Sequence, residues 1–407
     1  MKNKSIVLIF VCFYCCYVSP QNSVNTSEKQ KAIAKTIKKV KKEGYAFNQT
    51  FDDFEDRIVE HQKYIDTTTT VKTFVLTMNE IFDSYGLSHF WIWTPDEIKE
   101  LKDNSSFGLG ANLAKTELGY FVTKIVDNSP AQKSGIKTGD YIIEVNSKKI
   151  KFKDLLKGYN GQVDTVSVIR NDTLLKLNIE YFSFRSFSKD SMYALNANTT
   201  VITVNSFISN VYDRRAIESF FDKAKHTENI ILDLRSNGGG NSENVQHLLS
   251  MIIPRDRVCQ YFMHREDHEA FVKKHNRNPK SLIELINYNG REFKPLKLKS
   301  SLKVYSGNIF VIVDERSGSG GDVFPSCVQD VQRGKIIGNK TAGQVLSGES
   351  YKLNNGMVLF YPTGEYLRLS NQRLEGNGCI PDKLLSREET ANSKFVLDLI
   401  LSEFINN

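Results

Sequence analysis

Two glycine-rich segments, each following an apolar run, carry the residues best suited to chemistry. Residues 235–240 read Arg-Ser-Asn-Gly-Gly-Gly and follow the run 230–234, whereas residues 317–321 read Ser-Gly-Ser-Gly-Gly and follow the run 309–313. Three glycines allow a backbone to turn its N–H groups towards an oxyanion or a phosphate. Small neighbours leave the Ser319 hydroxyl accessible at a helix N-terminus, where amides stabilise negative charge. The second segment therefore suits a nucleophile.

Each segment taken alone also has a plainer interpretation. Residues 235–240 could be an ordinary glycine turn, since they lack both the Gly-Lys-Ser/Thr ending of a P-loop and the dinucleotide-binding pattern. Ser319 could be a helix cap, because serine is favoured there. Both segments, however, follow strands that read as neighbours in a parallel sheet. They would then face the crevice at the carboxyl ends of those strands, where ligands bind in open α/β folds.

A serine and a histidine stand side by side far upstream of Ser319. Residues 71–82 place apolar side chains at spacings of three and four, which predicts a helix that stops at Gly86. Ser88 and His89 follow this stop and precede an aromatic run that includes Trp91. A histidine here could simply pack against Trp91, so its role as a base needs support from other residues.

Strands and helices alternate from residue 200 onward and must position the glycine-rich segments. The predicted strands are 200–204, 230–234, 309–313 and 335–337, and the predicted helices are 213–225, 321–332 and one that begins near Ser242. This rhythm predicts a layered α/β domain of βαβ units. Residues 183–199, rich in Ser and Asn, read as a linker. Residues 255–302 are polar and irregular, and no element is predicted there.

Short alternating strands with turn signals occupy residues 104–182. Within them, Phe107-Gly108-Leu109-Gly110 looks like the carboxylate-binding loop of a PDZ domain, and residues 129–146 look like its short helix and following strand. The resemblance implies that this loop holds a peptide C-terminus on backbone N–H groups while the peptide adds a strand to the sheet. A β-rich domain that only packs is the alternative.

Four ordered motifs resemble those of the tail-specific (C-terminal processing) protease family. They are Asp233-Leu234-Arg235-x-Asn237-Gly238-Gly239-Gly240, residues 317–324, Gly338 with Thr341-Ala342-Gly343, and Glu375-Gly376-x-Gly378-x-Ile380-Pro381-Asp382. The match extends from about Ile81 to the C-terminus. It implies a serine peptidase in which Ser319, not Ser317, is the nucleophile. The resemblance also implies an oxyanion hole formed by the N–H groups of Gly239 or Gly240 and of Gly320.

The chain departs from the Ser–Lys members of that family. Their lysine follows the glycine of the Thr-x-Gly turn, where this sequence has Gln344, and Lys340 would have to reach Ser319 from a different point of the turn. Asp322 stands where the family has Glu. The branch similar to the catalytic core of the tricorn protease instead uses a Ser-His pair before the PDZ domain and a late Glu.

Ser88, His89 and Glu375 occupy the positions that this second branch uses. The resemblance implies that a neutral His89 accepts the proton of Ser319 and returns it to the leaving amine. Glu375, acting through the hydroxyl of Ser88, would orient the imidazole and stabilise its charged form.

Composition excludes several other classes of protein. The 407 residues are too many for one ordinary core, so two or three domains are expected. With 40% hydrophobic and 25% charged residues, the chain is neither disordered nor collagen-like. Its net charge of +7 is scattered without interleaved aromatics, which argues against nucleic acid. Beyond the first residues only Cys259, Cys327 and Cys379 remain, enough for one bridge at most, and no metal or cofactor is predicted.

The first residues read as a signal peptide. A basic start is followed by the apolar run 5–18 and by polar residues up to Asn22. A membrane anchor is the alternative, but the run is short for a bilayer span. Export to a periplasmic, cell-envelope or extracellular location is therefore predicted.

These observations combine into one expected organisation. The fold is multidomain α/β: a signal peptide over 1–22, an N-terminal helical domain carrying Ser88 and His89 over 23–103, a PDZ-like domain over 104–182 and a catalytic domain over 183–407. The expected function is that of an exported serine endopeptidase acting on unfolded or C-terminally exposed polypeptides. One alternative is a catalytically inactive relative that binds peptides as a scaffold, and another is hydrolysis of non-peptide esters or amides. The oligomeric state is left open.

Overall fold

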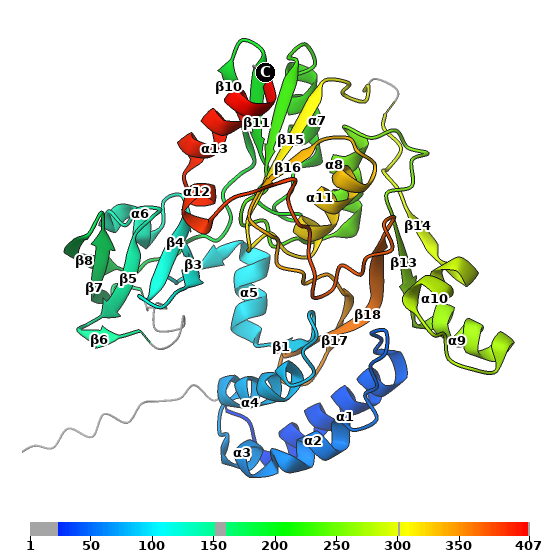
Figure 1. Ribbon diagram of the computed structural model, residues 1–407. Helices are drawn as coiled ribbons and strands as arrows, with labels where there is room; N and C mark the ends of the chain where they lie inside the picture. Colours follow the sequence, from blue (N-terminus) through cyan, green and yellow to red (C-terminus); the bar gives the residue numbers. More distant parts are fainter. Residues whose placement is uncertain (1–22, 151–159, 300–301, 406–407) are drawn as a thin grey trace, which may run out of the picture.

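The computed structural model describes residues 23–150, 160–299 and 302–405 (Figure 1). The predicted signal peptide, residues 1–22, lies outside these ranges. Within them, no helix combines the length and the apolar composition that crossing a membrane requires.

A six-stranded sheet is the centre of the C-terminal half, and its strand order is β10-β11-β12-β15-β16-β19. All neighbours are parallel except β10, which runs antiparallel to β11. The strands are β10 (Ser191–Asn196), β11 (Thr199–Thr203), β12 (Asn229–Asp233), β15 (Asn308–Val313), β16 (Lys335–Gly338) and β19 (Lys383–Leu384). The prediction of an α/β domain is confirmed.

The predicted linker over residues 183–199 is wrong where β10 forms. This strand lies at the edge of the sheet, and most of its side chains are exposed. An edge strand with a solvated face needs few apolar residues, so its composition resembles that of a loop.

Helices cover both faces of this sheet (Figure 1). One face carries α7 (Arg214–Lys223), α8 (Ser242–Ser250) and α11 (Gly320–Asp330), and the other carries α12 (Arg387–Ala391), α13 (Ser393–Ile400) and the π-helical turn Leu401–Ile405. Successive residues of β11, β12, β15 and β16 alternate between the two cores, as parallel strands buried on both faces require. The core beneath α7, α8 and α11 contains three free thiols, those of Cys259, Cys327 and Cys379.

A second, antiparallel sheet lies between the catalytic domain and the N-terminal helices (Figure 1). Its strands are β1 (Trp91–Trp93), β13 (Gln260–His264), β14 (Arg291–Phe293), β17 (Ser347–Lys352) and β18 (Val358–Arg368). Between β13 and β14 the chain forms α9 (Arg265–His275) and α10 (Leu282–Asn289). The expectation of no regular structure over 255–302 is therefore wrong. Helix α9 buries only Asp267 and Phe271, so its apolar periodicity is too weak to read.

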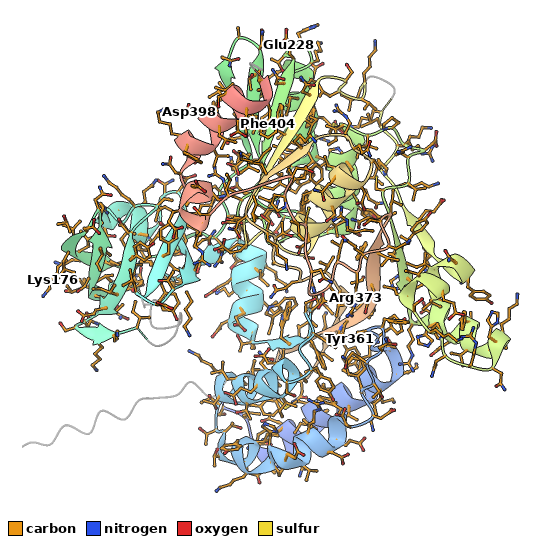
Figure 2. All side chains as sticks on the ribbon, in the orientation of Figure 1. Lys176, Glu228, Tyr361, Arg373, Asp398 and Phe404 are labelled. Carbon is orange, nitrogen blue, oxygen red and sulfur yellow. The ribbon has the colours of Figure 1, made fainter. Side chains whose placement is uncertain are left out.

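The N-terminal helices pack on one face of the second sheet. They are α1 (Thr26–Glu43), α2 (Phe54–Glu60), α3 (Gln62–Thr67) and α4 (Val71–Asp83). Helix α4 confirms the helix predicted over 71–82. Tyr361, labelled in Figure 2, points from β18 to these helices, and its hydroxyl donates to Glu43 Oε2 at 3.1 Å. Because α4 and β1 are both held in this core, the short segment between them has a fixed position.

The PDZ-like domain hydrogen-bonds to Arg235 in the first glycine-rich segment and to Arg316, which directly precedes the second. Over residues 104–182 its elements are β2 (Ser105–Ser106), β3 (Ala111–Lys115), β4 (Tyr120–Ile125), α6 (Pro130–Ser134), β5 (Tyr141–Val145), β6 (Lys148–Lys149), β7 (Val163–Arg170) and β8 (Thr173–Glu180). Helix α5 (Pro95–Asp103) precedes this range, and β9 (Phe184–Arg185), which follows it, pairs with β2. Lys124 on β4 donates to Asn205 Oδ1 at 2.8 Å and to the Arg235 carbonyl at 3.3 Å. Arg316, three residues before Ser319, donates to the Leu113 carbonyl of β3 at 2.9 Å.

Candidate active site

Ser319 occupies a sharp turn between β15 and α11. Its backbone has φ 52° and ψ −115°, a conformation that non-glycine residues rarely adopt and that is found at functional sites. The turn is held on both sides of the residue. The Ser319 N–H donates to the Gln344 carbonyl at 2.8 Å, and the Ser319 carbonyl accepts from Asp322 N at 2.9 Å and Val323 N at 3.0 Å. The geometry presents the hydroxyl at the N-terminus of α11.

The other glycine-rich segment packs directly against this turn. Gly239 has φ +90°, and a Cβ on it would lie 2.6 Å from both Ser319 Cβ and Gly320 N. Asn237, fully buried, holds the two segments together. Its side chain donates to the Val204 carbonyl and accepts from Gly239 N, and its carbonyl accepts from Gly318 N, each at 3.0 Å.

Sequence reasoning assigned no role to Asn237. The available signal was its place before three glycines, where one side-chain amide can hydrogen-bond to several backbone groups. Its bond to Gly239 also bears on the predicted oxyanion hole. The Gly239 N–H donates to Asn237 Oδ1 and is therefore engaged in this structure. The oxyanion hole itself stays a prediction.

His89, Ser88 and Glu375 meet Ser319 in one hydrogen-bonded series. His89 Nε2 lies 3.2 Å from Ser319 Oγ, and His89 Nδ1 lies 2.8 Å from Ser88 Oγ. Ser88 Oγ donates to Glu375 Oε2 at 2.8 Å, and the Ser88 N–H donates to Glu375 Oε1 at 2.9 Å. The four residues predicted from distant motifs are thus in contact. His89 also has a positive φ of 58°, as Ser319 does.

The direction of these hydrogen bonds fixes the tautomer of His89. A carboxylate only accepts, so the single hydroxyl hydrogen of Ser88 points to Glu375. Ser88 Oγ must then accept from His89, which places the imidazole hydrogen on Nδ1. Nε2 keeps its lone pair and accepts from the Ser319 hydroxyl. This tautomer is the one that a general base requires.

Backbone amides that sequence reasoning missed hold Glu375 in place. Val345 N donates to Glu375 Oε2 at 2.7 Å, and Leu346 N donates to the same oxygen at 3.1 Å. Leu346 N also lies 3.2 Å from Ser88 Oγ. Main-chain donors leave no mark in the residue types, so only the fold reveals them.

Asp322 anchors the turn that supports Ser319. Its buried carboxylate accepts from the Thr341 hydroxyl, from Gly343 N at 2.8 Å and from Gln344 N at 3.3 Å. Burial raises the pKa of Asp322 to about 6, although these donors oppose the shift. The side chains of Lys340 and Gln344 are exposed. The structure therefore uses the backbone of Gln344, not its side chain, to hold Ser319.

Comparisons with known proteins agree with this architecture. Residues 198–385 match the family model of peptidase family S41, and residues 108–181 match that of the PDZ domain. The chain carries a peptidase family S41 domain. The family resemblance inferred from the sequence motifs is thereby confirmed.

Two similar curated relatives are probable CtpA-like serine proteases from staphylococci. A probable CtpA-like serine protease of Staphylococcus haemolyticus is 24% identical over 300 residues, which cover 71% of this chain and 55% of that protein. Its counterpart in Staphylococcus epidermidis is 25% identical over 304 residues, covering 72% and 56% respectively. The chain thus spans about half the length of the curated relatives it matches.

Solved structures share the fold at low sequence identity. The photosystem II D1 C-terminal processing protease has a TM-score of 0.59 at 16% identity, covering 93% of this chain and 98% of that one. Mature CPAF has a TM-score of 0.58 at 13% identity, covering 92% and 95%. The tricorn protease has a TM-score of 0.50 at 16% identity, covering 93% and 37%.

The loop expected to bind peptides lies beside the S41 domain. Phe107 is 39% exposed and Leu109 is buried. Gly108, Leu109 and Gly110 line a pocket of about 240 Å³ together with β3 and Arg316. The structure does not bring Phe107–Gly110 into the hydrogen-bonded series around Ser319, and their role in peptide binding stays a prediction.

The contact between Gly239 and Ser319 in the S41 domain can be tested with two neighbouring glycines. Gly239→Ala should lower kcat/KM about 10²-fold or more, because the new methyl displaces Ser319. It should also lower the free energy of unfolding by about 1–3 kcal/mol, because of the positive φ and the clash. Gly238→Ala is the matched control, since a Cβ there meets nothing within 4 Å. Peptide turnover and chemical denaturation measure both effects, and equal behaviour of the two variants would contradict the argument.

The pH dependence of the S41 domain should follow from the burial of His89. Burial lowers the pKa of His89 from 6.5 to about 4, although the charge of Glu375 opposes the shift. A base acts only while neutral, so kcat/KM should hold as the pH falls below 6.5 and should drop as it passes through about 4. The measurement is kcat/KM for a chromogenic peptide across this range, with circular dichroism to verify folding. A fall in kcat/KM centred near pH 6.5, the ordinary histidine pKa, would contradict the effect of burial on His89.

Proposed function

We propose that the chain is a serine endopeptidase that hydrolyses peptide bonds of unfolded or C-terminally exposed polypeptides. The observation that carries the proposal is the unbroken hydrogen-bonded series from Ser319 through His89 and Ser88 to Glu375. The S41 family match supports the same activity. Ser319 is the proposed nucleophile, His89 the base, and Ser88 with Glu375 the groups that position the base.

The proposed reaction forms and then hydrolyses an acyl-enzyme on Ser319. Ser319 Oγ attacks the scissile carbonyl carbon while His89 Nε2 takes the hydroxyl proton. The carbonyl oxygen becomes an oxyanion near the Gly320 N–H at the start of α11. The C–N bond then breaks as His89 gives the proton to the leaving amine. Water then attacks the acyl ester carbon while His89 takes its proton. The ester C–O bond breaks as His89 returns that proton to Ser319 Oγ, and the carboxylic acid product leaves.

The hydrogen-bonded series of His89, Ser88 and Glu375 stabilises the positive charge that forms on His89 during this cycle. When Nε2 takes a proton, the imidazolium keeps its Nδ1–H on Ser88 Oγ. The Ser88 hydroxyl donates to Glu375 and accepts from the imidazolium, so the carboxylate stabilises the positive charge of His89 while Ser88 keeps its own proton. Four donated hydrogen bonds, from Ser88, Val345 and Leu346, keep that carboxylate fixed.

Two further assignments belong to this proposal. The PDZ-like domain would present polypeptides to the site, supported by its family match and by its hydrogen bonds to Arg235 in the first glycine-rich segment and to Arg316 just before the second. Export to the periplasm, the cell envelope or the extracellular space is proposed from the sequence pattern of residues 1–22.

Hydrolysis of an unfolded protein tests the proposal. Casein should be cut into fragments by the chain, and mass spectrometry should detect new termini inside its sequence. A chain that binds peptides but leaves casein intact would instead favour the inactive scaffold. Ester turnover without peptide turnover would favour hydrolysis of non-peptide substrates.

A further inference from the structure

Three aromatic rings form a continuous surface on strands β1 and β18. Trp91 lies opposite Phe360 in the strand pairing, and Trp93 is two residues further along β1. The Phe360 ring centroid is 5.1 Å from each indole, and the two indoles are 5.5 Å apart. All three side chains are half-buried. We call Trp91, Trp93 and Phe360 the aromatic shelf.

The aromatic shelf is not required by the core on the other side of its sheet. Ile92, Leu359 and Tyr361 alternate with the shelf residues along the two strands and are buried against the N-terminal helices. Strand residues alternate between faces, so the shelf is on the face turned away from those helices. A small residue supports Phe360 from the neighbouring strand, since a Cβ on Gly348 would lie 2.6 Å from its ring.

One end of the aromatic shelf adjoins the proposed base. The His89 ring centroid is 5.4 Å from Phe360 and 5.7 Å from Trp91, and His89 Nε2 faces Ser319. The Trp91 indole N–H is shielded from solvent and has no hydrogen-bond partner among the described residues. A buried indole N–H usually has one. The Trp91 ring is positioned by its contacts with His89, Trp93 and Phe360.

We propose that the aromatic shelf binds the apolar side chain that directly follows the scissile bond. This inference rests on the proposed function. His89 must reach the leaving nitrogen to protonate it, so the residue attached to that nitrogen emerges beside the imidazole, where the shelf begins. In the proposed mechanism the acyl carbonyl oxygen binds the Gly320 amide of the predicted oxyanion hole, so the acyl part of the substrate belongs to that part of the site. The shelf therefore selects polypeptides with Leu, Phe or a similar residue after the cut, and disfavours charged ones.

Tryptophan fluorescence tests the proposal without turnover. The chain has only two tryptophans, and both are in the aromatic shelf. In the Ser319→Ala protein, titration with Leu-Gly-Gly, which has the free amine of a leaving group, should shift the emission to the blue and saturate. Ser-Gly-Gly should bind at least about tenfold more weakly. Equal responses to the two peptides, or no response, would overturn the proposal.

Variants locate the binding surface in the same assay. Phe360→Ala in the Ser319→Ala background should weaken Leu-Gly-Gly binding about tenfold or more, and Phe360→Leu should weaken it less. Tyr64→Ala removes a 63% exposed aromatic ring on α3 and should change nothing. Circular dichroism melting establishes that each variant is folded. Unchanged binding in folded Phe360→Ala would also overturn the proposal.

Cleavage-site mapping separates this inference from the proposed function. Trp93→Ala should reduce the preference for apolar residues after the cut about tenfold and leave the preference before the cut unchanged. A change confined to residues before the cut would overturn the assignment. Saturable binding of Leu-Gly-Gly without casein cleavage by the unaltered chain would refute the peptidase and leave the shelf as a binding surface. Casein cleavage without a fluorescence response to Leu-Gly-Gly would support the peptidase and refute the aromatic shelf as the binding surface.

Discussion

Replacing Ser319 by alanine should lower kcat for casein hydrolysis about 10⁶-fold, and His89→Ala should do nearly the same. Ser319 is the proposed attacking group, and its hydroxyl lies 3.2 Å from the imidazole that takes its proton. Since neither residue is effective without the other, the double variant should be no worse than either single one. Fragment release followed by mass spectrometry measures the loss. The residual rate should reflect the oxyanion hole and substrate binding alone.

A third variant tests whether the position of the missing lysine matters. Gln344→Ala changes an exposed side chain and keeps the carbonyl that holds Ser319, so it should retain activity. Retention here beside loss in Ser319→Ala and His89→Ala would establish a Ser–His enzyme. Full turnover in either of those two variants would refute the assignment of the nucleophile and base.

Glu375→Gln should lower kcat about 10⁴-fold while leaving the chain folded. The carboxylate accepts from four donors, and the glutamine amide would present a donor to one of them. Ser88 could then turn its hydroxyl hydrogen towards His89 Nδ1. The imidazole would carry its own hydrogen on Nε2 and could no longer accept from Ser319.

The same chemical change on the surface provides the control for Glu375→Gln. Glu117 is exposed in a turn of the PDZ-like domain, so Glu117→Gln should have ordinary activity. Thermal unfolding of both variants separates a lost tautomer from a lost fold. NMR of ¹⁵N-labelled His89 reports the tautomer directly. An Nδ1–H imidazole in an inactive Glu375→Gln protein would contradict this explanation.

Sequence reasoning succeeded where the signal was local. The glycine-rich segments follow apolar strands within a few residues, and helix α4 shows its apolar face in consecutive turns. His89 and Glu375 were different: 230 residues separate His89 from Ser319, and 287 separate Ser88 from Glu375. Only the family resemblance linked them, since no periodicity spans such distances.

The failures of sequence reasoning have physical causes as well. Strand β10 looked like a linker because an edge strand tolerates polar residues on its exposed side chains. Helix α9 carried too narrow an apolar stripe to be recognised. The engaged amide of Gly239 was invisible because the direction of an N–H group depends on backbone angles that residue types do not specify. The direction of such a hydrogen bond is therefore known only from the three-dimensional structure.

The residues of the candidate active site are far apart along the chain, and this separation has a consequence for biogenesis. Ser88 and His89 lie near the beginning of the described chain, Ser319 lies in its second half, and Glu375 comes later still. Loop closure over such separations is slow compared with the formation of individual helices. In the proposed mechanism, a chain still emerging during synthesis has its histidine without its carboxylate and would not yet cleave other polypeptides. The proposed activity would thus be among the last properties that the folding chain acquires.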